Sequence, residues 1–309
     1  MTIITNMLFN ISEVLKNASA KLQSAGISSA RLDSELILCK VLHAERIYLY
    51  SNPEKILSEK ELEEFQSLLV QRLQRKPIQY ITGKQEFWSR DFVLNDEVLV
   101  PRPETEILIE TIVVDAEKLF LNAESEGRSL RILDVGTGSG IIAITIKNIL
   151  RSAHVVATDI SYGALKIAKL NSSINVQRDN LYGNILFVEA DIFQAFSDSL
   201  VEKRKAFDII VANPPYISSV EIDRLEPEVS EWEPRVALDG GDGGTEIIEK
   251  IIRSAWEYLM PGGMLLIETG ESQKEELIKI IDSCGKYIST KFINDYSGKE
   301  RALETWKKS

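Results

Sequence analysis

Cysteine and histidine are scarce in this sequence of 309 residues. The two cysteines, Cys39 and Cys284, and the two histidines, His43 and His154, lie far apart along the chain. A disulfide framework needs several paired cysteines, and a structural zinc site needs closely spaced Cys and His ligands. We therefore expect neither disulfides nor a metal centre.

Long apolar runs are also missing. No stretch approaches the roughly 18 to 20 consecutive apolar residues of a membrane-spanning helix. The first ten residues have neither the basic region and cleavage site of a signal peptide nor the arginines of a transit peptide. We expect a cytoplasmic protein that does not enter a membrane.

Positive charge is in deficit, because 36 Lys and Arg face 47 Asp and Glu, for a net charge of -11. This balance argues against a protein whose main affinity is for nucleic-acid phosphates, so we expect no direct nucleic-acid partner. Residues 1–90 carry 12 basic and 10 acidic residues, and the remainder therefore holds the whole acidic excess. Two interpretations, a solvated helix end and a partner-docking patch, fit the basic side chains in this first part: Arg72, Arg75, Lys76 and Lys84.

The sequence changes character near residue 85. Before it, residues 10–76 have helical periodicity, with capping-box spacing at Asn10 and Glu13 and again at Ser58 and Glu61. This pattern predicts a small helical bundle. In its second helix, at about 29–42, the residues expected on the inner face are Leu32, Leu36 and Cys39.

Three domains follow from the pattern. Residues 86–93 predict two short strands about a turn, so a hairpin joins the helical part to the rest. We expect a helical domain at 1–84, which would recognise the substrate, a β-hairpin linker at 85–101 and a larger domain at 102–309.

The larger domain alternates strands with helices, which is typical of an α/β fold with a doubly wound parallel sheet. The predicted strands are 131–135, 155–159, 186–189, 207–212, 264–268, 287–292 and 302–306. The predicted helices are 107–121, 141–150, 162–174, 245–259 and 274–284. Because no helix separates the last two strands, we expect them to pair antiparallel.

The tetrapeptide Asn213-Pro214-Pro215-Tyr216 follows the strand at 207–212. Its two prolines fix two φ angles and stiffen the loop. The Asn213 side-chain carbonyl and the Pro214 backbone carbonyl could accept both hydrogens of a planar NH2 group, while Tyr216 supplies a flat apolar face. The segment predicts a site that holds an amide or an amino-purine by its nitrogen.

A glycine-rich turn follows the strand at 131–135 and opens a helix. It consists of Gly136, Thr137, Gly138, Ser139 and Gly140. Closely spaced glycines let a ligand approach the backbone, although such turns also serve plain packing. Ile141 occupies the position of the third glycine of the dinucleotide fingerprint, so NAD is the weaker interpretation.

Two acids follow the next two strands. Asp159 could bind the hydroxyls of a ribose or cap the helix that begins near Ser161. Asp191, with its apolar neighbour Ile192, could meet the edge and face of a base or could be a surface-loop acid. Because the carboxyl ends of parallel strands share one edge of the sheet, these segments together predict a nucleoside pocket.

This arrangement resembles the class I methyltransferases that depend on S-adenosylmethionine, and the tetrapeptide resembles their amino-group-methylating branch. That branch includes adenine-N6 DNA enzymes, so the tetrapeptide alone does not select a substrate. Nearly the whole chain is similar to the HemK-like peptide chain release factor glutamine methyltransferases. The segments that carry this similarity are 77–83, 100–106, 238–244 and 295–301, behind the helical bundle.

The resemblance implies a seven-stranded Rossmann-like sheet and methyl transfer to the side-chain nitrogen (N5) of the glutamine in the Gly-Gly-Gln motif of release factors, which modulates translation termination. It implies that the turn Gly136 to Gly140 holds the donor, that Asp159 binds its ribose, and that Asp191 and Ile192 meet its adenine.

The same resemblance implies that Asn213, Pro214, Pro215 and Tyr216 bind the substrate amide. Asn213, Pro214 and Tyr216 would be catalytic, and Asn213 would also contact the donor. The implied partner is a release factor, and we expect the chain to act as a monomer.

Three other functions stay open on the residues alone. A DNA adenine-N6 methyltransferase shares the tetrapeptide but needs a basic recognition domain, and the excess here is acidic. A methyltransferase for glutamine in another protein, such as a ribosomal protein, fits the same chemistry. A non-catalytic donor-binding module would transfer no methyl group to any protein.

Overall fold

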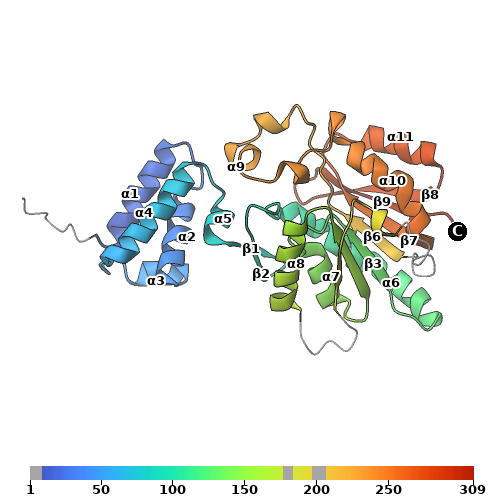
Figure 1. The fold of residues 1–309 in the computed structure, drawn as a ribbon, viewed down its shortest axis with the longest axis horizontal. Helices are drawn as coiled ribbons and strands as arrows, with labels where there is room; N and C mark the ends of the chain where they lie inside the picture. Colours follow the sequence, from blue (N-terminus) through green and yellow to red (C-terminus); the bar gives the residue numbers. More distant parts are fainter. Residues whose placement is uncertain (1–8, 177–183, 197–206) are drawn as a thin grey trace, which may run out of the picture. The chain divides into compact units, whose positions relative to one another are not determined.

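The computed structural model describes residues 9–176, 184–196 and 207–309. The described residues form two compact units, one from residues 9–84 and 226–232 and the other from the described part of residues 85–225 and 233–309 (Figure 1). Within the described part of the chain, no helix has both the length and the apolarity to cross a membrane.

The first unit is a helical bundle. Its N-terminal helices are α1 (Ile11–Ser24), α2 (Ala30–Leu42), α3 (Arg46–Ser51), α4 (Glu59–Leu73) and α5 (Ile78–Thr82). Both predicted capping boxes are present, with Asn10 and Ser58 as the N-caps of α1 and α4. The predicted bundle is confirmed.

The inner face predicted for α2 is right for Cys39, which packs against the apolar core of the bundle, and wrong for Leu32. Leu32 is 42% exposed, whereas Asp33 and Glu35 are buried. Both carboxylates form ion pairs. Asp33 Oδ2 lies 2.7 Å from Arg72 Nε, and Glu35 Oε2 lies 2.6 Å from the Arg46 guanidinium. Buried charges need such partners, and the sequence periodicity of apolar residues gives no sign of them.

Arg72 and Arg75 form ion pairs within the helical unit. Arg72 contacts Glu228 at 2.9 Å as well as Asp33, and Arg75 contacts Glu228 at 2.7 Å. Glu228 comes from α9 (Pro227–Ser230), a short helix in the segment 226–232. Neither a solvated helix end nor a docking patch describes these two arginines, since their charges are already paired.

The predicted hairpin is also present. It consists of β1 (Lys84–Phe87) and β2 (Arg90–Val93). Trp88 and Ser89 form the two-residue turn between them, with φ of 51° and 56°. Left-handed values at both positions match the tight turn that favours the twist of a β-hairpin.

The second unit is built on a seven-stranded sheet in the order β5-β4-β3-β6-β7-β9-β8. Its strands are β3 (Arg131–Val135), β4 (His154–Asp159), β5 (Leu186–Glu189), β6 (Phe207–Ala212), β7 (Leu259–Glu268), β8 (Tyr287–Asn294) and β9 (Glu300–Lys307). The first five are parallel, and β9 pairs antiparallel with both β7 and β8, as predicted for the last two strands. This strand order confirms the predicted class I methyltransferase fold.

Helices cover both faces of the sheet (Figure 1). They are α6 (Glu106–Ser125), α7 (Ile141–Ile149), α8 (Tyr162–Asn175), α10 (Glu246–Tyr258) and α11 (Lys274–Cys284). Helices α6 and α7 share one apolar cluster with one face of the sheet, and α10 and α11 share a second cluster with the other face. Strands β4 and β5 are added on one side of β3, and the later strands are added on the other side, beginning with β6. This change of side between β3 and β6 leaves a crevice at their carboxyl ends.

Candidate active site

The glycine turn begins at the carboxyl end of β3 and leads into α7. Gly136, Gly138 and Gly140 have φ angles of 72°, 55° and 85°. These are left-handed values that residues with a Cβ rarely adopt. A Cβ at Gly136 would meet only the carbonyl oxygen of Asn213, at 4.0 Å, so open space lies above this backbone. A Cβ at Gly140 would lie 2.9 Å from the Ile144 side chain, so Gly140 serves the packing of α7.

Two acids hold the turn in shape. The Thr137 hydroxyl donates to Asp134 at 2.6 Å, and the backbone N–H of Gly138 donates to Asp159 Oδ2 at 2.8 Å. Asp159 Oδ1 accepts from the Ser161 N–H, while the Ser161 hydroxyl caps α8. Asp159 is therefore not the cap of that helix: it joins the ends of β3 and β4.

Burial controls the protonation of both acids. It raises the pKa of Asp134 to about 7, against the opposing hydrogen bonds from Thr137 and Ala143. It also raises the pKa of Asp159, again against opposing backbone hydrogen bonds. Asp134 is fully enclosed, whereas Asp159 is partly exposed and retains acceptor capacity toward the pocket.

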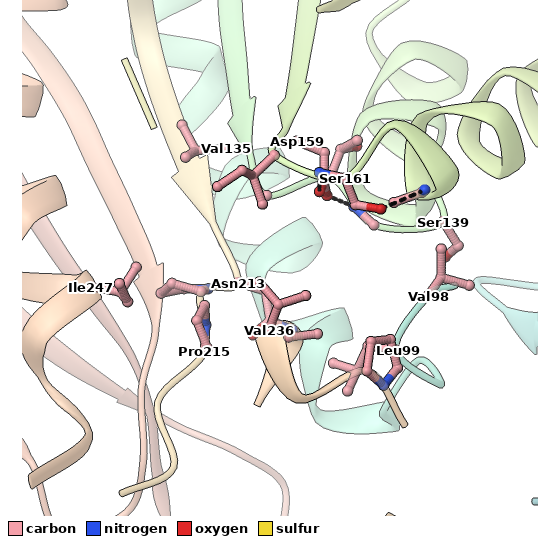
Figure 2. Close-up of a pocket in the computed structure, with 18 of the residues that line it drawn as sticks. Val98, Leu99, Val135, Ser139, Asp159, Ser161, Asn213, Pro215, Val236 and Ile247 are labelled. Atoms are coloured by element: carbon pink, nitrogen blue, oxygen red, sulfur yellow. Dashed lines mark hydrogen bonds between the residues drawn. The ribbon is translucent and has the colours of Figure 1, made fainter. Parts of the chain in front are cut away.

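One pocket contains most of the predicted donor-binding residues (Figure 2). They are Gly136, Thr137, Gly138, Ser139, Asp159, Asp191, Ile192 and Asn213. Pro214 and Pro215 line the same pocket, but Gly140 and Tyr216 do not. The turn and the tetrapeptide therefore face one shared space, although they lie more than 70 positions apart in the sequence.

Asp191 and Ile192 differ in their surroundings. Asp191 is exposed, and Ile192 is partly buried against the apolar cluster that contains α10. Ile192 has a φ of 49°, which turns the chain sharply after β5. An exposed carboxylate beside an apolar side chain gives this wall one polar and one apolar element.

The tetrapeptide is held by side chains from other segments. Asn213 Nδ2 donates to Thr105 Oγ1 at 3.3 Å, and the Tyr216 hydroxyl donates to Glu268 Oε1 at 3.3 Å. Gln273 Nε2 donates to the carbonyl oxygen of Tyr216 at 2.9 Å. These contacts hold the tetrapeptide in place, while Asn213, Pro214 and Pro215 still line the pocket.

Several pocket residues are missing from the sequence prediction. Val98 and Leu99 come from the segment after the hairpin, and Val236 and Ile247 come from the region after the tetrapeptide (Figure 2). These are ordinary apolar residues with no local signature. Thr105, Glu268 and Gln273 were likewise missed, although Thr105 lies in one of the segments that carry the family resemblance.

Comparison with known proteins gives matches along almost the whole chain. Residues 13–83 match the family model "PrmC N-terminal domain", and residues 118–232 match "Ribosomal protein L11 methyltransferase (PrmA)". Three curated proteins called release factor glutamine methyltransferase are similar throughout. The one from Geobacter sulfurreducens is 36% identical over 90% of both chains. Those from Koribacter versatilis and Aliivibrio fischeri are 35% and 38% identical, over 95% and 97% of this chain and 97% and 99% of theirs.

Proposed function

The chain belongs to the release factor glutamine methyltransferase family, and we propose that it transfers a methyl group from S-adenosylmethionine to the side-chain nitrogen of the glutamine in a release factor's Gly-Gly-Gln motif. The observation that carries this proposal is the shared pocket. Gly136, Asp159 and Asn213 line one space at the carboxyl edge of β3, β4 and β6.

The residues of this pocket fit an adenosyl donor. The left-handed turn at Gly136 to Gly140 admits a ligand close to the backbone, and Asp159 offers carboxylate lone pairs to vicinal ribose hydroxyls. Ile192 offers an apolar surface for the face of a purine, with Asp191 beside it for a ring amino group. The bound donor would supply a sulfonium-activated methyl group.

The acceptor amide would bind at the tetrapeptide. Asn213 Oδ1 and the Pro214 carbonyl are two acceptors on one rigid loop, and a carboxamide NH2 has two hydrogens to donate. Gripping both hydrogens turns the nitrogen lone pair toward the donor side of the pocket. Tyr216 would support this geometry as part of the catalytic loop, because its hydroxyl and its carbonyl are both tied down.

Orientation and electrostatics would provide most of the catalysis. An amide nitrogen is a poor nucleophile because its lone pair is delocalised, and positive charge grows on it as the methyl group arrives. Carbonyl oxygens aimed at the NH2 hydrogens stabilise that charge. Holding the reactants in line contributes on the order of 7 to 11 kcal/mol at best. As the N–C bond formed, the S–C bond to the methyl group would break and S-adenosylhomocysteine would leave. The methylated nitrogen would then lose one proton to solvent, so no protein base is required before the transfer.

The helical unit would recognise the release factor. One glutamine side chain offers too little surface to select a protein, so a separate recognition surface is needed. We propose residues 1–84 for this role, 85–101 as the linker and 102–309 as the transferase domain. We further propose that the chain acts as a monomer in the cytoplasm, without binding nucleic acid directly.

A ribosomal protein is the second candidate substrate. The match of residues 118–232 to the ribosomal protein L11 methyltransferase model favours it, although that match covers only part of the transferase unit. The two candidates share methyl transfer to a protein and differ in the protein that presents the acceptor.

Incubation with labelled donor tests both candidates. The protein is mixed with a release factor, with the same factor carrying Gln→Ala in its Gly-Gly-Gln motif, or with ribosomal protein L11. We expect label on the motif glutamine of the native factor only, located by peptide mass mapping. Label on L11 alone would support the second candidate, and no label on any protein would support a donor-binding module.

A further inference from the structure

The acceptor loop rests on a group of four polar side chains, two of them buried and two partly buried, which we call the Thr105 cluster: Thr105, Glu268, Asn213 and Tyr216. Thr105 ends the short 3-10 helix Pro103–Thr105, and it is fully buried. Its Oγ1 accepts the hydrogen bond from Asn213 Nδ2. The cluster therefore touches the residue that is central to the proposed amide clamp.

Glu268 is the second fully buried member of the cluster. It is 1% exposed and ends β7, whose Ile267 pairs with Ala212 at the end of β6. Asn213 follows Ala212 and Glu268 follows Ile267, so the two residues lie at the same end of neighbouring strands. Glu268 Oε2 has no hydrogen-bond partner of standard geometry among the described residues, which is costly for a buried carboxylate.

The hydrogen bond from Asn213 limits which way the Thr105 hydroxyl proton can point. Burial raises the pKa of the Glu268 carboxyl to about 7, while a hydrogen bond from Thr105 and the charge of Arg301 lower it. A hydrogen bond that lowers the pKa of a carboxyl is one donated to the ionised form. Because Thr105 Oγ1 accepts from Asn213, its single hydroxyl proton points away from Asn213 and is available to Glu268.

This direction determines what Asn213 can do. A hydroxyl has one proton to donate, so Thr105 can only accept from its other neighbour. Asn213 must then turn its NH2 group toward Thr105, as the contact of 3.3 Å shows. Its carbonyl oxygen is left for the pocket that Asn213 lines.

We propose that Thr105 and Glu268 are positioning residues that set the orientation of the Asn213 carboxamide. A reversed carboxamide would aim its own N–H groups at the NH2 group of the acceptor, and donor would face donor. The inference rests on the proposed function, since it assumes that the acceptor is an amide held through its hydrogens.

Replacement of the Thr105 hydroxyl tests the inference. Thr105→Val keeps the shape and removes the proton, and Thr105→Ser keeps the proton. We expect Thr105→Val to lower kcat about 10- to 100-fold, which is less than the roughly 10²- to 10³-fold loss for removing a transition-state contact itself. Thr105→Ser should retain activity within about threefold. Donor affinity, measured by calorimetry with S-adenosylhomocysteine, should stay within about twofold for both variants.

Two matched variants control for lost stability. Thr111→Val removes a buried hydroxyl from α6 that bonds only the Ile107 carbonyl, and Glu304→Gln neutralises a buried acid on β9. Both should leave kcat unchanged, and thermal unfolding should show whether all variants are folded. An active wild type whose Thr105→Val variant is equally active, or loses only donor affinity, would overturn this inference alone. A wild type that leaves the glutamine unmethylated would overturn the proposed function and this inference with it.

Discussion

The two sides of the pocket are built from different kinds of atoms. On the donor side, backbone groups and glycines shape the turn, and Asp159 binds the N–H groups of Gly138 and Ser161. On the acceptor side, side chains support the loop, and Thr105 and Glu268 lie far from Asn213 in the sequence. The donor side is therefore shaped by backbone groups at the ends of parallel strands, whereas the acceptor side is held by side chains from distant segments.

This difference predicts separable effects of substitution. A change on the donor side should act on donor affinity, because the loop geometry there meets the ligand directly. A change on the acceptor side should act on kcat, because orientation of the amide matters most in the transition state. A single variant that changed donor affinity and kcat by equal factors would contradict this separation of the two sides.

Asn213→Ala should have the largest effect. It deletes the side-chain acceptor of the clamp, and we expect kcat to fall about 10²- to 10³-fold, as for loss of one group that stabilises transition-state charge. Affinity for S-adenosylhomocysteine should change by no more than about twofold. Single-turnover methylation of the release factor and calorimetry measure the two quantities. Asn148→Ala, at a partly buried amide that bonds the Asn175 carbonyl, is the matched control. Normal turnover in Asn213→Ala would end the clamp hypothesis.

Asp159→Ala should have the next largest effect, and on the other quantity. A hydrogen bond to a charged group contributes about 1.5 to 3 kcal/mol, so donor affinity should fall roughly 10- to 100-fold. At saturating donor, kcat should remain within about threefold of wild type. Glu189→Ala is the matched control, because Glu189 pairs with Asp159 in the sheet but is exposed and does not line the pocket. Calorimetry that finds unchanged donor affinity would contradict the ribose-binding role.

The same difference explains what could be predicted from the sequence. The strands at 131–135, 186–189 and 207–212 coincide with β3, β5 and β6, because branched apolar runs bounded by glycine, proline and polar residues leave little ambiguity. The turn at Gly136 to Gly140 was found because positive φ angles leave a trace as glycine.

What the sequence could not provide was the support beneath the site. Glu268 was only the last residue of a predicted strand, and Thr105 was only one member of the segment 100–106 that carries the family resemblance. Their role depends on the pairing of β6 with β7, which brings Glu268 close to the tetrapeptide, and on the hydrogen bond between Thr105 and Asn213. Likewise, the burial of Asp33 depends on Arg72, which lies 39 positions away.

The pH dependence of kcat should sharpen the comparison further. The pKa of Glu268 is raised to about 7, so the carboxylate becomes protonated below neutrality and no longer requires the Thr105 proton. The Asn213 carboxamide could then reverse, and kcat should fall about tenfold from its plateau to around pH 6. The charge of Arg301 and the hydrogen bond from Tyr216 lower the pKa of Glu268, and the charge of Glu104 raises it.

Glu268→Gln provides the control for this profile. It removes the titrating group, so the fall near pH 7 should disappear from kcat. Asp134 also has a pKa raised to about 7, but it lies beneath the glycine turn and should affect donor affinity. A variant Glu268→Gln that kept the wild-type kcat profile would assign the titration to another group.

Tyr216→Phe should have the smallest effect. It keeps the aromatic ring and removes one long hydrogen bond of 3.3 Å to Glu268, so we expect kcat to fall only about two- to fivefold, in line with about 0.5 to 1 kcal/mol. The hydroxyl lowers the pKa of Glu268, and its loss should move the midpoint of the kcat profile to higher pH. Tyr287→Phe removes a buried hydroxyl that bonds the Ile252 carbonyl and should leave the midpoint unchanged. An unshifted midpoint in Tyr216→Phe would mean that Thr105 and Arg301 alone hold the carboxylate, and the acceptor side would then rest on fewer contacts than its geometry indicates.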